Sequence, residues 1–336
     1  MTQEQIYKLV AGGSFPDSAG SPELIETHIS WVILCEKFAY KIKKPIHYSF
    51  LDFSTIEKRH YYCKRELALN KRLTDDIYLD VQNITKKNGL PSVNGKDGEI
   101  IDYAVRMRKV NREFQMDLLL AKNDVTVLQI QQLAEKIASF HTHTDIIYRK
   151  DYLDVATKFK DLEMEKVYLG EQLGAHTKQM ITHSIDASDR FVEKNKHLVA
   201  ARLREHFYRD CHGDLHSRNI FFVPEPQPFD CIEFNDDIRQ IDVLNEVAFL
   251  CMDLEALGRK DLSDLFMSDY NKLFPSMKTE EDRKLFVYYK SYRSNIRAKI
   301  NSLRARSAGK EGQKKIALAE AEKYLQLMYG YIREIQ

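Results

Sequence analysis

The stretch that decides the fold is HGDLHSRN, residues 212–219, in which His212, Asp214 and Asn219 carry the functional groups. A carboxylate and a carboxamide stand five residues apart, and a histidine lies two residues before the carboxylate. The stretch follows a helical region and precedes two runs of strand-like composition, IFFV and PFDCIEF. A polar loop between a helix and a β hairpin suits catalytic groups, whereas the alternative interpretation is an ordinary polar surface turn.

The spacing matches the pattern H-x-D-x-x-x-x-N of loops that catalyse phosphoryl transfer from ATP. In such a loop the Asp accepts the hydrogen of the attacking hydroxyl, and the Asn directs its amide oxygen at magnesium. We therefore predict that Asp214 is the catalytic base, with His212 beside it in the loop, and that Asn219 is a magnesium ligand. ATP and Mg²⁺ are the expected cofactors.

A second acidic magnesium ligand is expected on the β segment that follows the loop. The candidates are Asp230 and Glu233 in the run FDCIEF, residues 229–234. On a strand these two side chains would point to opposite faces, so only one of them should reach the metal. Glu233 is the first choice and Asp230 the alternative, since either carboxylate is a hard oxygen ligand.

Two lysines on a predicted strand are candidates for binding the ATP phosphates. The run FAYK, residues 38–41, fits the V-A-I-K pattern with Lys41 at the lysine position, and Lys43 on the same face is the alternative. The lysine should pair with a glutamate on the next helix. We expect Glu66 in that role, because Glu57 lies too near the start of the helix.

The pattern along the chain predicts a small β-rich lobe followed by a large helical lobe. Residues 1–24 read as a helix and connector, 25–110 as the β-rich lobe with one helix, and 111–336 as the helical lobe. The expected β runs of the small lobe are ISWVILC, FAYKIKK, IYLDVQNIT and EIIDYAVRMRKV, with KKNGLPSVNGKDG as a polar hairpin loop between the last two. In the helical lobe, VLQIQQLAEKIASFHTH reads as an amphipathic helix. The helix of the small lobe should begin with a capping box at Ser54 and Glu57. Its expected apolar face consists of Ile56, Tyr62, Leu67, Leu69 and Leu73.

Composition limits the class of protein. The net charge of +1 favours neither nucleic acid nor membrane as a partner, and no apolar run is long enough to cross a bilayer. The N-terminal sequence lacks the features of a signal peptide. Five cysteines are scattered singly, which is typical of free thiols in a reducing compartment, so a cytoplasmic location is expected.

Several segments resemble the aminoglycoside phosphotransferase-like branch of the protein-kinase-like superfamily, whose loop begins H-G-D. The resemblance extends from about residue 25 to residue 303 and is carried by four longer stretches. These are IETHISWVILCEKFAYKIKKP, FLDFSTIEKRHYYCKRELALNKRL, DCIEFNDDIRQIDVLNEVAFLCMDL and YRSNIRAKI. They are similar to a bacterial group labelled aminoglycoside phosphotransferase family enzymes. Some members of that group carry an added P-loop domain, whose G-x-x-x-x-G-K-[ST] sequence does not occur here.

The resemblance implies an α+β, bilobal protein-kinase-like fold with an ATP-binding lobe at residues 25–110. It supports the roles of Asp214 and Asn219, and it places the adenine-binding hinge near Met107, Arg108 and Lys109. It also implies that Glu246 helps to fix the catalytic loop. Relatives often use Asp where Glu233 stands, and the segment 26–30 replaces a glycine-rich loop.

A basic stretch near the C-terminus is the candidate substrate site. Residues 283–315 hold eleven Lys or Arg and one acid, and Arg293 and Arg297 share a helical face. They could bind an anionic substrate, and nucleic acid is an unlikely partner that only this stretch would support. The alternative is a solvated amphipathic helix with Tyr289, Ile296, Ile300 and Leu303 packed inward.

These observations predict an ATP- and magnesium-dependent phosphotransferase that acts on a hydroxyl group of a small molecule. Two rival hypotheses remain, a protein Ser/Thr kinase and a nucleotide-binding pseudokinase that acts as a regulatory module. The identity of the acceptor and the oligomeric state are not readable from the sequence.

Overall fold

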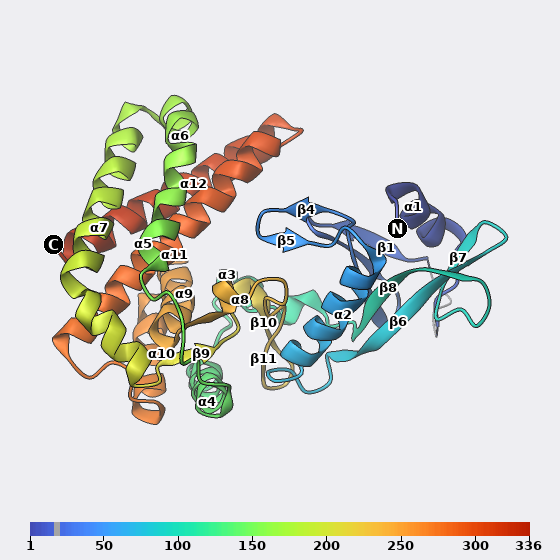
Figure 1. Ribbon diagram of the computed structural model, residues 1–336, viewed down its shortest axis with the longest axis horizontal. Helices are drawn as coiled ribbons and strands as arrows, with labels where there is room; N and C mark the ends of the chain where they lie inside the picture. The colour runs from blue at the N-terminus through green and yellow to red at the C-terminus, as the bar shows by residue number, and fades with distance from the viewer. Residues whose placement is uncertain (17–20) are drawn as a thin grey trace. The chain divides into compact units, whose positions relative to one another are not determined.

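The computed structural model describes residues 1–16 and 21–336, which form two compact units (Figure 1). The β-rich unit comprises residues 1–123, 212–214 and 218–239, and the helical unit comprises residues 124–211, 215–217 and 240–336. The predicted α+β class, with a β-rich N-terminal part and a mostly helical C-terminal part, is confirmed. Most of the HGDLHSRN stretch belongs with the β-rich unit, although it lies far along the chain.

A six-stranded antiparallel sheet forms the centre of the β-rich unit, with strand order β1-β2-β3-β8-β6-β7. Its strands are β1 (Glu23–Glu26), β2 (Ser30–Leu34), β3 (Phe38–Lys43), β6 (Tyr78–Lys87), β7 (Leu90–Val93) and β8 (Glu99–Arg108). The β2–β3 hairpin and the long strands β6 and β8 agree with the expected β runs. The loop expected between β6 and β8 contains the extra strand β7, so that expectation was wrong.

The two faces of this sheet pack against different helices. Tyr40 and Ile42 of β3 share a core cluster with Ile6 and Leu9 of α1 (Gln3–Gly12). Ala39 lies in a second cluster with Cys63 of α2 (Ile56–Asn70). Because side chains alternate along a strand, Lys41 and Lys43 share the face of Ala39 and point toward α2.

Helix α2 differs from its sequence prediction in two respects. Its N-cap is Thr55, whose hydroxyl accepts a hydrogen bond from the backbone of Lys58, whereas the hydroxyl of Ser54 binds Asp52. The buried face is not the expected apolar set but a stripe with helical spacing, composed of Arg59, Cys63, Glu66 and Asn70. Mostly polar side chains therefore occupy the position of a core stripe, each needing a partner in the interior.

Smaller elements complete the β-rich unit. They are β4 (His47–Tyr48), β5 (Leu51–Asp52), η1 (Arg112–Phe114), α3 (Met116–Ala121), β10 (Ile220–Phe222), β11 (Pro226–Pro228) and α8 (Asp236–Arg239). The expected strand PFDCIEF is wrong beyond its first residue. Strand β11 pairs with β10 and ends at Pro228, and residues 229–234 form an irregular segment.

The helical unit is built around long antiparallel helices. Its elements are α4 (Val127–His143), α5 (Asp154–Phe159), η2 (Lys160–Glu165), α6 (Lys166–Leu173), α7 (Ala175–Arg204), β9 (Tyr208–Asp210), β12 (Gln240–Asp242), α9 (Val243–Ala256), α10 (Lys260–Leu273), α11 (Glu280–Ser307) and α12 (Glu311–Glu334). The short η3 (Ser217–Asn219) belongs to the HGDLHSRN stretch. Helices α11 and α12 pack along each other (Figure 1), and α9 is buried along nearly its whole length.

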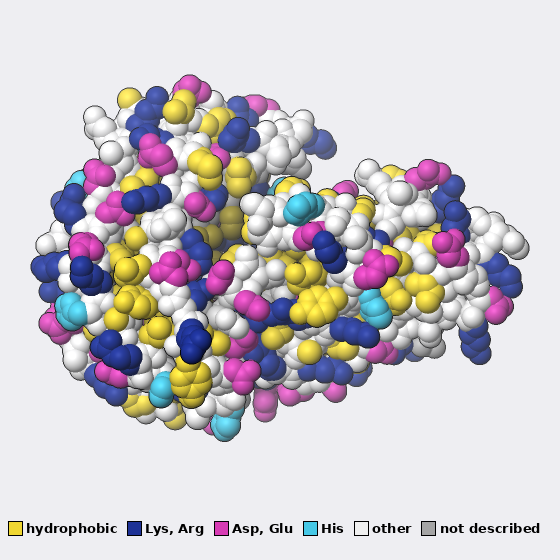
Figure 2. All heavy atoms as spheres, in the orientation of Figure 1, with side chains coloured by type: hydrophobic (Ala, Val, Ile, Leu, Met, Phe, Trp, Pro, Cys, Tyr) yellow, Lys and Arg dark blue, Asp and Glu magenta, His cyan; other side chains and the backbone are white. Residues whose placement is uncertain are grey.

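The surface carries no large region of a single charge on the face shown in Figure 2, where basic and acidic side chains are interspersed. This mixture agrees with the net charge of +1. Among the described residues, none of the helices combines the length and apolar character needed to cross a bilayer.

Candidate active site

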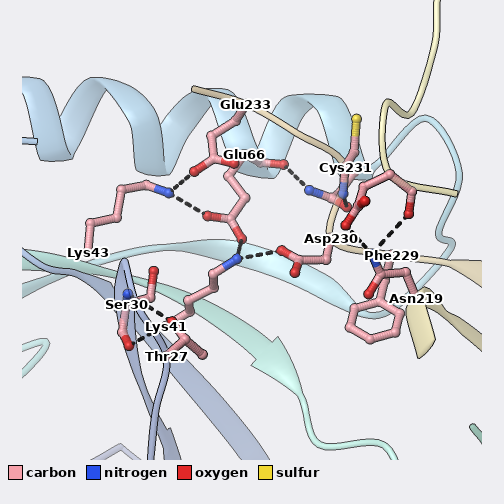
Figure 3. A network of polar contacts seen from close by, with 12 residues as sticks. Thr27, Ser30, Lys41, Lys43, Glu66, Asn219, Phe229, Asp230, Cys231 and Glu233 are labelled. Carbon is pink, nitrogen blue, oxygen red and sulfur yellow. Dashed lines mark hydrogen bonds and ion pairs between the residues drawn. The ribbon is translucent and has the colours of Figure 1, made fainter. Parts of the chain in front are cut away.

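Two lysines and three carboxylates form a continuous ionic cluster in the β-rich unit (Figure 3). Lys41 Nζ lies 2.8 Å from Glu66 Oε1 and 2.5 Å from Asp230 Oδ1. Lys43 Nζ lies 2.7 Å from Glu66 Oε2 and also contacts Glu233 Oε1. Glu66 therefore bridges both lysines, and each lysine reaches one acid of the segment that follows β11.

The two ends of this cluster differ in exposure. The side chains of Lys43 and Glu66 are fully buried and that of Glu233 is 4% exposed, whereas the Asp230 side chain is 44% exposed. Lys41 lies between these extremes at 12%. The cluster thus has a closed end at Lys43 and Glu233 and an open end at Lys41 and Asp230.

Burial and charge act on the titration of these groups in opposite directions. Burial alone would raise the pKa of Glu66, but Lys41 and Lys43 outweigh it and lower that pKa to about 2. Burial raises the pKa of Glu233 in spite of its contact with Lys43. Burial would lower the pKa of Lys43, but Glu233 and Glu66 outweigh it and raise the pKa. Of the two buried glutamates, Glu66 is therefore the more firmly ionised.

The segment carrying Asp230 is fixed by side chains from α2 and β6. Asp230 has φ +64°, an uncommon conformation for a residue other than glycine, and its backbone N–H donates to the Tyr78 hydroxyl at 3.2 Å. The next backbone N–H, that of Cys231, donates to Asn70 Oδ1 at 2.9 Å. Backbone strain of this kind persists where neighbours enforce it, often at functional sites.

His212 joins the HGDLHSRN loop to the same segment through hydrogen bonds to backbone groups. Its Nδ1 accepts from the backbone N–H of Asp214 at 3.2 Å, so the ring proton is on Nε2, which donates to the carbonyl of Phe229 at 2.9 Å. The imidazole of His212 therefore bridges the backbone N–H of Asp214 and the carbonyl of Phe229, the residue before Asp230. The geometry thus gives His212 an orienting part within the predicted catalytic set.

Gly213 allows the loop to pass close to this segment. Its φ is +90°, and a Cβ at this position would meet the Cα of Arg239 at 3.2 Å and Cδ1 of Ile232 at 3.3 Å. Only glycine tolerates this combination of backbone angle and close approach.

Asp214 and Asn219 face each other across the loop. Asn219 Nδ2 donates to the backbone carbonyl and to Oδ2 of Asp214, both at 3.0 Å. The amide nitrogen is thereby directed at the half-buried Asp214, and the amide oxygen lies on the opposite side of the group. The carbonyl of Asn219 also accepts from the backbone N–H of Phe229 at 2.9 Å, which connects it to Asp230.

Asp253, which the sequence pattern did not indicate, holds Ser217 of the loop within the helical unit. Asp253 of α9 accepts from the backbone N–H and the hydroxyl of Ser217 at 2.9 and 2.5 Å. Burial would raise the pKa of Asp253, but the charges of His216 and Arg297 together with the Ser217 hydrogen bonds lower it. The signal in the sequence was a single acid within the apolar run VAFLCMDL, residues 247–254. The sequence had pointed to Glu246, which is also buried in α9.

The predicted hinge residues lie at the end of β8. The backbone N–H groups of Arg108 and Lys109 donate to the carbonyls of Ile77 and Lys37 at 2.8 and 2.9 Å, and Met107 is buried between neighbouring strands. These two N–H groups are engaged within the β-rich unit, and contact with adenine stays a prediction for this segment.

The predicted anion site on α11 is buried within the helical unit. Arg293 Nε donates to Asn245 Oδ1 at 2.7 Å, and the guanidinium of Arg297 lies over the Tyr324 ring at 5.3 Å. Their part in substrate binding stays a prediction. The alternative interpretation was wrong for Ile300 and Leu303, which are 41% and 43% exposed, because the arginines occupy the inward face instead.

The structure thus brings Lys41, Lys43, Glu66, Asp230 and Glu233 into one cluster, and backbone hydrogen bonds connect this cluster to His212, Asp214 and Asn219. All eight belong to the β-rich unit.

Sequence comparison identifies curated relatives that are longer than this chain. The chain is 30% identical over 285 residues to the uncharacterized proteins Rv2004c of Mycobacterium tuberculosis and Mb2027c of Mycobacterium bovis. The match covers 83% of this chain and 54% of each mycobacterial protein, so the chain spans about half their length. No family model matches the sequence.

Comparison with solved structures identifies the fold. A choline/ethanolamine kinase family protein from Mesorhizobium loti superposes with a TM-score of 0.52 at 10% identity, covering 99% of this chain and 100% of that chain. An aminoglycoside phosphotransferase of the APH(2″) type, in complex with GDP and kanamycin, gives 0.50 at 13% identity, covering 96% and 98%. Ethanolamine kinase from Plasmodium vivax gives 0.50 at 8% identity, covering 96% and 87%. The chain therefore has the protein-kinase-like fold of the aminoglycoside phosphotransferases and the choline and ethanolamine kinases.

Proposed function

We propose that this chain is an ATP- and magnesium-dependent phosphotransferase that transfers the γ-phosphate to a hydroxyl group of a small-molecule acceptor. The observation that carries the proposal is the connection between two groups of residues. The Asp214–Asn219 loop is joined by backbone hydrogen bonds to the segment whose acids pair with Lys41 and Lys43. The structural neighbours named above are small-molecule kinases, which favours a small acceptor over a protein.

In this proposal Asp214 accepts the hydrogen of the acceptor hydroxyl as the hydroxyl oxygen attacks the γ-phosphorus. Asn219 orients the Asp214 carboxylate through its amide nitrogen. Lys41, held by Glu66, offsets negative charge on the phosphates at the open end of the cluster. Catalysis then rests on positioning and on electrostatic stabilisation of a transition state that needs little covalent participation by the protein.

The residues present fit a magnesium ion, which prefers carboxylate and carbonyl oxygens. When bound, the ion would neutralise charge on the phosphates of the nucleotide. Asn219 would supply its amide oxygen, and Asp230 and Glu233 are both candidates for the second ligand. We favour Asp230, although the sequence favoured Glu233, because Asp230 is at the exposed end and Glu233 is buried against Lys43.

The test is phosphate transfer from radiolabelled ATP to a pooled small-molecule extract and, separately, to cellular proteins. Wild type should label a small molecule, and Asp214→Asn should reduce labelling by at least about a thousandfold while still binding ATP. Asp97→Asn, at an exposed position of the same unit, is the matched control and should keep full activity. Full activity of Asp214→Asn would remove Asp214 from the role.

Two matched variants separate the candidate metal ligands. Asp230→Asn should raise the magnesium concentration needed for half-maximal rate, whereas Glu233→Gln should mainly lower thermal stability. The reverse result would return the assignment to Glu233.

The same labelling experiment distinguishes the alternatives. Label confined to protein would indicate a protein kinase, and the absence of label despite bound ATP would indicate a pseudokinase. We place the protein in the cytoplasm, because its five cysteines are buried thiols, as is usual in a reducing compartment.

A further inference from the structure

A cavity of about 1080 Å³ lies inside the helical unit, lined by the C-terminal end of α9 and by residues of α10, α11 and α12. Its volume is at the upper end of the range of about 300–1,000 Å³ that is typical of small-molecule sites. None of the residues proposed above for phosphoryl transfer lines it. The lining combines apolar side chains, among them Met267, Phe286 and Leu327, with an ordered polar group.

The polar group is centred on Glu255. Its Oε1 accepts from Ser263 Oγ at 2.9 Å and from Lys290 Nζ at 3.0 Å, and its Oε2 accepts from Tyr331 Oη at 2.5 Å and from Lys290 Nζ at 3.2 Å. Four hydrogen bonds therefore satisfy the carboxylate, which presents no strong acceptor to a further cationic group.

Lys290 retains capacity that the protein does not use. Its side chain is 10% exposed, and Glu255 takes two of its three N–H donors. The faces of Tyr331 and Phe286 lie 4.5 and 5.4 Å from Nζ, and across residues 1–16 and 21–336 the third donor has no hydrogen-bond acceptor. A buried ammonium group with one donor to spare favours an anionic or strongly accepting ligand atom.

The other basic residues of the lining already have acidic partners. Lys260 pairs with Asp264, Lys272 with Asp269, Arg283 with Glu280 and Lys323 with Glu320. The case for an anionic ligand therefore rests on Lys290.

Gly330 lies at the exposed rim of the cavity, on α12. A Cβ there would have no neighbour within 4 Å. A large side chain at this position could therefore extend over the cavity without meeting the protein.

We propose that this cavity binds one amphipathic organic anion, with its acidic group at Lys290 and its apolar body against Met267, Phe286 and Leu327. The inference does not depend on the proposed phosphotransferase activity.

The probe for the test is 1-anilinonaphthalene-8-sulfonate, an aromatic anion that fluoresces when it enters an apolar site, with decanoate as the competitor. We expect one saturable site per folded chain, displaced by decanoate and unaffected by saturating ATP and Mg²⁺. Gly330→Trp should fill the cavity and abolish the site, whereas the matched Gly330→Ala should retain it and not lower the melting temperature. Lys290→Met should weaken binding about tenfold, and Lys284→Met, at an exposed position of the same helix, should not.

Three results would overturn the proposal. These are the absence of a saturable site in the folded wild type, equal binding by Gly330→Trp and Gly330→Ala, or displacement of the probe by ATP. If Lys290→Met does not fold, the Gly330 pair still decides the question, because neither substitution removes a contact within the protein.

Discussion

Glu66 is the residue on which the ionic cluster depends, because one buried carboxylate satisfies both Lys41 and Lys43. Removing one partner from a buried ion pair is costly, since the remaining charge stays in the interior without compensation. Without the Glu66 charge, Lys41 would keep only its contact with Asp230, and Lys43 only its contact with Glu233.

Glu66→Gln should therefore lower the free energy of unfolding at pH 7 by about 3–5 kcal/mol. The folded-state pKa of Glu66 is about 2, below its usual 4.5, so the ionised group stabilises the fold above pH 4.5. That stability is lost as the pH falls through 2, and the difference between variant and wild type should shrink below pH 4.5. Urea unfolding at pH 7, 5 and 3 measures it. Glu57→Gln is the matched exposed control on α2, and an equal effect of the two substitutions would contradict the assignment.

Gly213→Ala tests how closely the HGDLHSRN loop approaches its neighbours. Alanine would adopt a strained positive φ and would press on the backbone of Arg239, so we expect a loss of about 2–3 kcal/mol in stability. Gly258→Ala is the control, because Gly258 also has a positive φ but has open space around it, and it should lose only about 1 kcal/mol. Equal melting temperatures of the two variants would show that the close approach has no energetic weight.

At the level of single residues, the sequence predicted the ionic pair of Lys41 and Glu66 correctly. It did not predict that Asp230 and Glu233 would join this pair and Lys43 in one cluster. Strand periodicity placed Lys41 and Lys43 on one face, and the structure confirms this. Periodicity could not place Asp230 and Glu233, because the segment is not a strand and the positive φ of Asp230 breaks the alternation on which the argument relied. Asp253 was missed because its partner, Ser217, is distant in sequence.

Helix α2 shows why a functional element can mislead a search for apolar patterns. Its buried stripe is Arg59, Cys63, Glu66 and Asn70. The three polar members bind partners outside the helix: Arg59 binds Asp102, Glu66 binds the two lysines of β3, and Asn70 accepts from the backbone N–H of Cys231. A helix that positions an ion pair must bury polar side chains, so hydrophobicity marks the wrong face.

The start of α2 gives a prediction at the scale of the element. Thr55→Ala should lower stability by about 1 kcal/mol, because the hydroxyl of Thr55 caps the backbone N–H of Lys58. Ser54→Ala should have a smaller effect, because the hydroxyl of Ser54 binds the half-buried Asp52 side chain and caps no backbone N–H of the helix's first turn among the described residues. Thermal unfolding of the two variants measures the difference, and a larger loss in Ser54→Ala would restore the cap expected from the sequence.

Other elements followed from the sequence to different degrees. The α4 bounds, Val127–His143, coincide with the helix read from VLQIQQLAEKIASFHTH, because its amphipathic period and its capping residue Thr126 agree. Strand β7 was missed because its residues, LPSV, lie in a run rich in Gly, Asn and Lys that is typical of loops.

For the molecule as a whole, the fold was predictable because the eight-residue loop, the lysine strand and the following helix occur in a fixed order. The chain spans about half the length of the mycobacterial proteins that it matches.

Nucleotide binding should stabilise the whole molecule. ATP with Mg²⁺ at a hundred times the dissociation constant should raise the free energy of unfolding by about 2.7 kcal/mol in wild type and in Asp214→Asn. Lys41→Met should lose most of this gain, whereas Lys87→Met, on an exposed edge of the same sheet, should keep it. Thermal shift across a nucleotide titration measures the effect, and equal stabilisation of both lysine variants would separate Lys41 from phosphate binding.

The burial of the five cysteines has a practical consequence. All five are buried, and burial raises the pKa of the Cys63 and Cys251 thiols to about 12, so neither of these two forms appreciable thiolate at neutral pH. A cysteine introduced at an exposed position such as Lys284 would react with a maleimide far faster than the native thiols. The wild-type background is therefore ready for single-site fluorescent labelling, without first removing a native cysteine.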